Sequence, residues 1–177
     1  MTVPASYPPP SRRPVPVLYL DIDGTVRRGK DQLGRFVNGP ADVQVFPEAV
    51  TLMRRWKDAG GRVVGVSNQG GIALGHVSRH AVAAAMAETC RQAEDLIDYL
   101  LWCPHHPAAT EPEDARCWCR KPAPGLLIVA ATRLAETFPE YYPPHLGRMV
   151  GDRPEDEQCA AAAGVDFQWA EDWRAAA

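Results

Sequence analysis

Three carboxylate side chains in this sequence lie where they could act together on one ligand. Asp21 and Asp23 come directly after the apolar run 17–20, and Asp152 follows the apolar run 149–151. A pair of carboxylates two residues apart, joined by a third from another strand, makes a hard oxygen site of the kind that Mg²⁺ prefers. We therefore predict a magnesium site among these residues.

A second group of polar residues, Ser67, Asn68 and Gln69, follows the expected strand 62–66. Taken singly, such groups have ordinary explanations, since Asp-Gly is a common turn and acids such as Asp156 are favoured at helix N-termini. Their shared position at the ends of strands is less ordinary, because open parallel sheets bind ligands outside the carboxyl ends of their strands. We therefore expect these groups to converge on one site.

Cysteine and histidine residues cluster between positions 103 and 119. Cys103, Cys117 and Cys119 lie in this stretch, together with His105 and His106. Three thiolates and one imidazole complete a tetrahedral Zn²⁺ site with no open position, which is typical of a structural metal. The sequence predicts bound zinc here, with one of the two histidines as the fourth ligand.

The elements that position these residues can be predicted from apolar periodicity and from helix punctuation. Pro47 suits a first helical turn, Ser78 a helix cap, and Gly60 and Gly164 helix stops. Strands that alternate with helices form a parallel sheet covered by helices on both faces. The predicted fold class is α/β, a three-layer Rossmann-like arrangement of about five parallel strands. The expected strands are 17–20, 62–66, 98–102, 148–151 and 165–169, and the expected helices are 47–59, 78–93, 124–137 and 155–163.

The length of 177 residues predicts one domain. Residues 1–16 contain six prolines and are expected to form an extended tail, followed by a single domain over 17–177 with a zinc loop at 103–119. The intervals 22–46 and 103–123 are too short for a folded cap domain, which needs roughly 50 residues or more. We therefore expect an open cleft without a cap.

Charge and hydropathy narrow the range of partners. The chain has 22 acidic and 19 basic residues, a formal net charge of −3, and no long block of like charge. These values argue against a general nucleic-acid or membrane binder. No apolar run approaches the roughly 18–20 residues of a membrane span, and no signal pattern opens the sequence. We expect a cytoplasmic monomer.

The strand-end residues together resemble the signature motifs of the haloacid dehalogenase superfamily. The first motif is similar to Asp21-Ile22-Asp23-Gly24-Thr25, and Ser67 matches the second. Lys121 in Arg120-Lys121-Pro122 matches the third motif, and Asp152 with Asp156 matches the fourth. The resemblance covers residues 17 to about 169.

This resemblance implies a role for each residue in phosphoryl transfer. Asp21 would be the nucleophile that forms an aspartyl-phosphate, and Asp23 the general acid and base. The side chain of Asp21, the backbone carbonyl of Asp23 and the carboxylate of Asp152 would hold Mg²⁺, with Asp156 orienting the metal shell. Ser67 and Lys121 would bind the phosphoryl group, as would the segment around Asn68 and Gln69.

Two further segments narrow the resemblance to the D,D-heptose 1,7-bisphosphate phosphatases and the related histidinol-phosphate phosphatases. The first is the cysteine-rich loop, with Cys-Pro-His-His-Pro at 103–107 and Cys-Trp-Cys-Arg-Lys-Pro at 117–122. The second is Ser-Asn-Gln-Gly-Gly-Ile-Ala at 67–73. The family pattern favours His105 as the fourth zinc ligand and leaves His106 as the alternative. Ile22 and Leu74 depart from it, because the subfamily usually has arginine at both positions.

The two arginines that the subfamily usually has are absent here, and their absence bears on which substrate the site accepts. Arg120, Arg153 and the segment from Arg27 to Gln32, with Arg28 and Lys30, are candidates to bind the distal part of the substrate. A one-phosphate substrate fits this composition as well as a bisphosphate.

The predicted function is a Mg²⁺-dependent, zinc-containing phosphomonoesterase acting on a small phosphorylated metabolite. A heptose bisphosphate or similar sugar phosphate is the preferred substrate. The alternatives are histidinol phosphate, a DNA 3′-phosphate, which the negative net charge disfavours, and a non-catalytic binding module on the same fold.

Overall fold

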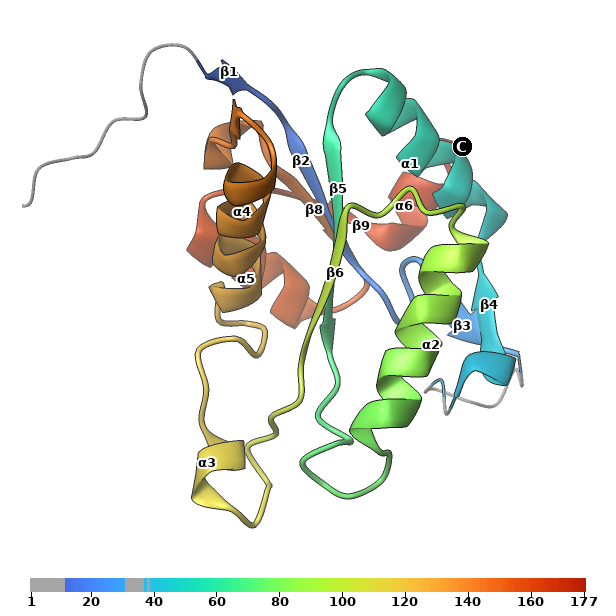
Figure 1. Ribbon diagram of the computed structural model, residues 1–177, viewed down its shortest axis with the longest axis vertical. Helices are drawn as coiled ribbons and strands as arrows, with labels where there is room; N and C mark the ends of the chain where they lie inside the picture. Colours follow the sequence, from blue (N-terminus) through green and yellow to red (C-terminus); the bar gives the residue numbers. More distant parts are fainter. Residues whose placement is uncertain (1–11, 31–36, 38) are drawn as a thin grey trace, which may run out of the picture.

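A five-stranded, fully parallel sheet forms the centre of the molecule (Figure 1). The computed structural model describes residues 12–30, 37 and 39–177. Every residue of the central strand is buried, as its continuous apolar sequence predicts for a strand covered on both faces. In spatial order the strands are β6 (Tyr99–Cys103), β5 (Arg62–Asn68), β2 (Val17–Asp21), β8 (Arg148–Gly151) and β9 (Asp166–Trp169).

Helices cover both faces of the sheet, as the alternating pattern predicts (Figure 1). On one face lie α1 (Pro47–Asp58), α2 (Arg79–Gln92) and α6 (Ala170–Arg174), and on the other α4 (Gly125–Thr137) and α5 (Pro154–Ala163).

The predicted helix punctuation is confirmed at both kinds of helix end. The Ser78 side chain accepts a hydrogen bond from the backbone N–H of Ala81, which caps α2. Gly164 ends α5 in the left-handed conformation, with φ of 70°. The positions of these caps fix where each helix begins or ends relative to the strand that precedes or follows it.

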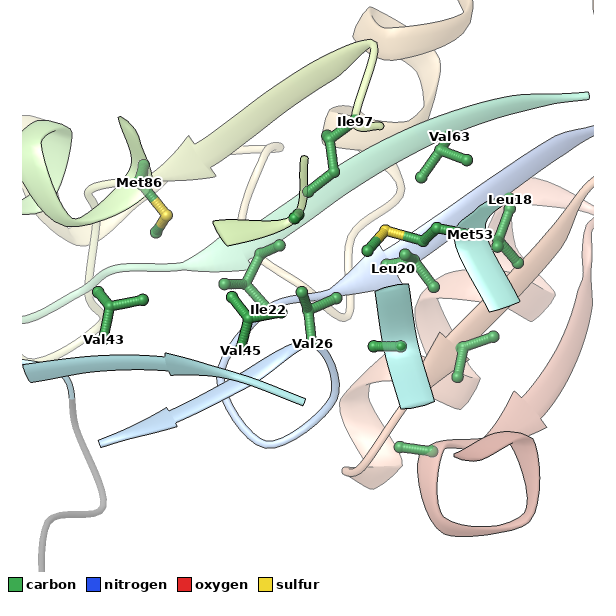
Figure 2. Close-up of a cluster of buried hydrophobic side chains, with 14 of the residues drawn as sticks. Leu18, Leu20, Ile22, Val26, Val43, Val45, Met53, Val63, Met86 and Ile97 are labelled. Atoms are coloured by element: carbon green, nitrogen blue, oxygen red, sulfur yellow. The ribbon is translucent and has the colours of Figure 1, made fainter. Parts of the chain in front are cut away.

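Two apolar cores lie on either side of the sheet. Alternating residues of β2 supply both, because successive side chains of a strand point to opposite faces. Leu18 and Leu20 point into the core beneath α1 and α2, where they meet Met53 and Val63 (Figure 2). Tyr19 packs on the opposite face against the core under α4 and α5. Burying one such aliphatic side chain stabilises the fold by roughly 1.5–3 kcal/mol.

A short antiparallel hairpin, β3 (Arg27–Gly29) and β4 (Val43–Val45), inserts between β2 and α1. The sequence pattern predicts no strands in this interval. A 3₁₀ helix, Pro40–Asp42, precedes β4, and the hairpin packs beside α2 (Figure 1). Residues 31–36, which include Asp31 and Gln32 at the end of the segment expected to bind substrate, lie outside the described residues.

The boundary between tail and domain differs from the prediction. Residues 1–11 lie outside the described part of the chain, but β1 (Arg13–Pro14) pairs in parallel with β7 (Glu140–Tyr141). Val15 is fully buried in the core under α4. The domain therefore begins before residue 17, because these residues gain backbone pairing and apolar burial. No helix among the described residues is long and apolar enough to cross a membrane.

Candidate active site and metal centre

Parallel register brings the predicted residues to one edge of the sheet. Asp21 ends β2 opposite Val66 of β5, and Asn68 at the end of β5 lies opposite Cys103 of β6. The carboxyl ends of the strands thus place the acidic site and the first thiolate of the cysteine cluster side by side.

A buried lysine joins two of the predicted acids. The Nζ atom of Lys121 lies 2.5 Å from a carboxylate oxygen of Asp21 and 2.6 Å from one of Asp156. All three side chains are buried. A charge is stable in such a place only when it is paired, and each of these groups has its partner here.

The pKa values of this group follow from burial and pairing. Burial raises the pKa of Asp21 to about 7, with Lys121 opposing the rise and Asp156 adding to it. Burial lowers the pKa of Lys121, but Asp21 and Asp156 outweigh it and raise the pKa above its usual value. Burial also raises the pKa of Asp152, which Arg153 partly offsets. Lys121 is therefore the charged partner throughout the neutral range.

The carboxylates of Asp21, Asp152 and Asp156 each offer an oxygen within 4.8 Å of the others. This all-oxygen donor set fits Mg²⁺. Asp156 accepts from the backbone N–H of Arg153 at 3.1 Å with one oxygen while the other faces Lys121, which agrees with an orienting role. Gly24 approaches so closely that a Cβ there would lie 2.1 Å from Asp152 Oδ2.

The side chain of Asp23 is not part of this carboxylate group and has hydrogen-bond partners outside it. One oxygen accepts a hydrogen bond from Arg27 Nε at 2.8 Å, and the other accepts one from Gln69 Nε2 at 2.6 Å. Ser67 Oγ is 3.4 Å from the second oxygen. Asp23 is thus oriented by its neighbours, and only its backbone could contribute to the metal site as predicted.

Two residues expected to bind substrate have other partners in the structure. Arg27 is 1% exposed and bonds within the core, so its assignment to substrate binding is wrong. Arg28 is exposed, donates to Gln44 at 2.9 Å and stacks on the Phe46 ring. Neither side chain lines the pocket at the strand ends.

Asn68 serves the backbone of the loop that carries Lys121. Its side-chain nitrogen donates to the carbonyl of Lys121 at 3.0 Å, and its oxygen accepts from the N–H of Lys121 at 3.0 Å. Both polar atoms of the side chain are therefore engaged. The side chain of Asn68 thus positions the lysine, and phosphate contact from the backbone N–H groups that follow Ser67 stays a prediction.

The four predicted zinc ligands converge in one group. Their ligand atoms lie within 4.8 Å of one another. Cys103 Sγ is 3.5 Å from Cys117 Sγ and 3.1 Å from Cys119 Sγ, while His105 Nδ1 is 3.3 Å from the last sulfur. Such a compact set of three thiolates and one imidazole fits tetrahedral Zn²⁺. His106 lies outside the group, with its Nδ1 accepting from Ala108 N–H at 3.1 Å.

The cysteine cluster is continuous with the acidic site. The backbone N–H of Arg120 donates to Cys117 Sγ at 3.3 Å, and its guanidinium donates to the carbonyl of His105 at 3.1 Å. Lys121 follows immediately. The conformation of the loop 103–119 therefore determines where the side chains of Arg120 and Lys121 lie.

A pocket of about 320 Å³ opens above these residues. Arg120, Arg153 and His106 are among its polar lining residues. Of the apolar lining residues, the sequence singles out only Leu74, because other single aliphatic residues in loops carry no functional signal. The apolar lining residues and one further histidine are Val37, Leu74, Val77 and His76.

Arg174, near the end of the sequence, was also missed. Its guanidinium donates to the carbonyls of Gly24 and Thr25 at 2.8 and 2.9 Å and stacks on the ring of Phe46. It therefore ties the loop after β2 to helix α6. Nothing in the local sequence around this arginine distinguishes it from a surface residue.

Comparison with solved structures defines the class of the protein. A protein described as a HAD-like phosphatase from Mesorhizobium loti superposes with a TM-score of 0.73 at 31% identity, covering 86% of this chain and 70% of that one. D,D-heptose 1,7-bisphosphate phosphatase from B. bronchiseptica, complexed with magnesium and phosphate, has a TM-score of 0.70 at 28% identity, covering 86% and 79%. Fold and site together define a phosphatase of the HAD class, as predicted.

Sequence relatives define the family. The D-glycero-β-D-manno-heptose-1,7-bisphosphate 7-phosphatase of Salmonella typhi is 34% identical over 160 residues, covering 85% of this chain and 77% of the relative. The enzyme of the same name from Escherichia coli K12 is 33% identical over 160 residues, covering 85% and 76%. No family model matches the chain. The chain belongs to the D-glycero-β-D-manno-heptose-1,7-bisphosphate 7-phosphatase family.

Proposed function

We propose that this enzyme removes the 7-phosphate of D-glycero-D-manno-heptose 1,7-bisphosphate. The observation that carries the proposal is the Asp21–Lys121–Asp156 ion-pair group at the floor of a pocket, with Asp23 beside it. The names of the sequence relatives support the choice of substrate.

The reaction would proceed in two displacements. A carboxylate oxygen of Asp21 attacks phosphorus, the ester bond breaks, and Asp23 gives its proton to the departing alkoxide. Asp23, now ionised, takes a proton from water, and the resulting hydroxide attacks the aspartyl-phosphate. Phosphate leaves and Asp21 regains its carboxylate, while Asp23 keeps the proton that it took from water.

The remaining residues balance charge around the phosphoryl group. Lys121 and the hydroxyl of Ser67 would bind its oxygens. The carboxylates of Asp21 and Asp152, with the backbone carbonyl of Asp23, would hold Mg²⁺. When bound, this cation neutralises charge between the anionic nucleophile and the anionic substrate.

The cysteine cluster would hold zinc as a structural ion. Cys103, His105, Cys117 and Cys119 fill all four tetrahedral positions, which leaves none for substrate or water. The ion would therefore order the loop that carries Arg120 and Lys121.

The lining of the pocket supports a second candidate substrate, a sugar with a single phosphate. Leu74 and Val77 present an apolar wall, while Arg120 and Arg153 supply positive charge on other parts of the lining. A bisphosphate would use these cations for its distal phosphate. A monophosphate would need fewer of them.

The test measures phosphate release from heptose 1,7-bisphosphate, heptose 7-phosphate and histidinol phosphate in the presence of Mg²⁺. We expect the bisphosphate to have the highest kcat/KM. Asp21→Asn should lower kcat by at least about 10⁴-fold while leaving the circular dichroism spectrum unchanged, because it removes the nucleophile. Near-native turnover by this variant would refute the aspartyl-phosphate mechanism. We expect the active species to be a monomer and the protein to be cytoplasmic.

A further inference from the structure

Arg27 is an arginine buried in the core next to the active site. Its side chain is 1% exposed, although it begins the short hairpin strand β3. Burying a guanidinium is costly unless it is paired and hydrogen-bonded. Its partners therefore account for its presence.

The guanidinium bridges helix α2 and the loop after β2. Its Nη1 donates to the carbonyl of Ala85 at 3.0 Å and to the hydroxyl of Thr89 at 2.7 Å. The Thr89 hydroxyl itself donates to the Ala85 carbonyl at 2.8 Å, so a lone pair remains for Arg27. From this fixed position, Nε donates to Asp23 Oδ1 at 2.8 Å.

The backbone of Arg27 also fixes the loop that carries Asp23. The N–H of Arg27 donates to the carbonyl of Ile22 at 3.0 Å, and the N–H of Gly24 donates to the carbonyl of Arg27 at 2.8 Å. Backbone hydrogen bonds to the residues before and after Asp23 thus fix its main chain, and the bond from Arg27 Nε fixes its carboxylate. Gln69 engages only the second oxygen, Oδ2.

We propose that Arg27 is a positioning residue that orients Asp23 for proton transfer to the leaving group. This inference rests on the proposed function, in which Asp23 is the general acid. Because Oδ1 is bonded to the buried guanidinium, Oδ2 is the atom that passes its proton to the ester oxygen. The planar fork of arginine suits this task, since its donors have fixed directions.

The test exploits the different need of two leaving groups for a proton. Phenolate, with a conjugate-acid pKa of about 10 as in tyrosine, leaves better when protonated, whereas p-nitrophenolate leaves without help. We measure kcat/KM, which reports the first displacement, for phenyl phosphate and p-nitrophenyl phosphate. For Arg27→Met we expect a loss of about 100-fold on phenyl phosphate and less than about fivefold on p-nitrophenyl phosphate.

Two further variants separate positioning from stability. Thr89→Val removes one partner of Arg27 and keeps the side-chain shape, so it should shift the substrate ratio in the same direction by roughly threefold to tenfold. Arg62→Met removes a partly buried arginine paired with Glu140 at the opposite end of β5. It should lower the melting temperature without changing the ratio.

The ratio of kcat/KM on the two substrates distinguishes a positioning role of Arg27 from a structural one. Equal losses on both substrates in Arg27→Met show a purely structural role and overturn the proposal, and if that variant does not fold, an unchanged ratio in folded Thr89→Val does the same. Asp23→Asn serves as the reference for the general acid. If Asp23→Asn itself shows no preference between the substrates, the assigned role of Asp23 fails and the proposal fails with it. If only Asp23→Asn shows the preference, the role of Arg27 alone is refuted.

Discussion

At the scale of single residues, Gly24 is the tightest point of the site. Its φ of 98° is a backbone conformation that side chains rarely adopt, and a Cβ would lie 2.1 Å from Asp152 Oδ2. Arg174 holds the same loop through the carbonyl of Gly24. The position therefore requires glycine both for its conformation and for the space that Asp152 occupies.

We predict that Gly24→Ala weakens Mg²⁺ binding by about 10–100-fold, because the added methyl displaces Asp152, a predicted metal ligand. The measurement is the Mg²⁺ concentration that gives half-maximal activity. Gly164→Ala is the matched control, since Gly164 has φ of 70° but has only Pro144 Cβ nearby, at 3.8 Å. The control should cost about 1–2 kcal/mol of stability and leave the Mg²⁺ dependence unchanged. Equal Mg²⁺ dependence in both variants would contradict this account.

Residue types at strand ends could be predicted from sequence, but their side-chain partners could not. Asp21, Lys121 and Asp156 converge as the motifs indicate, because parallel strands bring their carboxyl ends to one edge. The bonds from Asn68 to the backbone of Lys121 and from Arg27 to Thr89 depend on rotamers and on packing between distant segments. The sequence places Arg27 in a segment expected to bind substrate, and only the structure shows that its side chain is buried and bonds within the core.

At the scale of elements, the loop 103–119 joins the predicted zinc site to the segment that carries Lys121. Cys103 ends β6, and Cys117 and Cys119 precede Lys121 by only a few positions. A loop of this length has little apolar surface of its own to bury, and metal binding can contribute apparent energies of roughly 10–16 kcal/mol in small domains. The order of this loop should therefore depend on the ion.

We predict that the purified protein contains about one zinc per chain and that Cys119→Ser lowers the zinc content, the melting temperature and kcat together. Elemental analysis and thermal unfolding of the same samples give the measurement. Cys90→Ser is the control, because Cys90 lies on α2 away from the cluster, and it should keep its zinc. Full activity in zinc-free protein would show that the loop is ordered without metal.

Long elements with clear ends could be predicted, and short ones could not. Helix α2 has a serine cap and α5 a glycine stop, and both lie close to their expected bounds. Strands β3 and β4 have three residues each, which is too short for an alternating pattern to be distinctive. Their burial arises from packing against α2, a contact between segments far apart in the sequence.

At the scale of the whole molecule, the two ends of the parallel strands carry different groups. The candidate active site lies at the carboxyl ends of the strands, whereas ion pairs that join separate elements lie at the amino ends. Arg62, the first residue of β5, forms two hydrogen bonds with Glu140 of β7, at 2.9 and 3.0 Å, and also lies 3.7 Å from Asp98. Its guanidinium stacks on the ring of Phe138, 3.6 Å from the centroid.

This ion-pair group should make the stability of the fold depend on pH. The hydrogen bonds from Arg62 lower the pKa of Glu140 below its ordinary value of 4.5, although burial opposes them. A carboxyl group whose folded pKa is depressed binds fewer protons in the folded than in the unfolded state. Its contribution to stability is therefore complete above about pH 4.5 and is lost as the pH falls through the folded pKa.

We predict that Glu140→Gln lowers the free energy of unfolding at pH 7 by up to about 1 kcal/mol, the range of partly exposed ion pairs. The difference from the natural protein should shrink as the pH falls below about 4.5, because protonated Glu140 then resembles glutamine. Urea denaturation at several pH values gives the measurement. kcat/KM should stay unchanged at neutral pH, since Glu140 lies at the end of the sheet opposite Asp21. A stability difference that is the same at every pH would show that shape, and not charge, determines the contribution of Glu140.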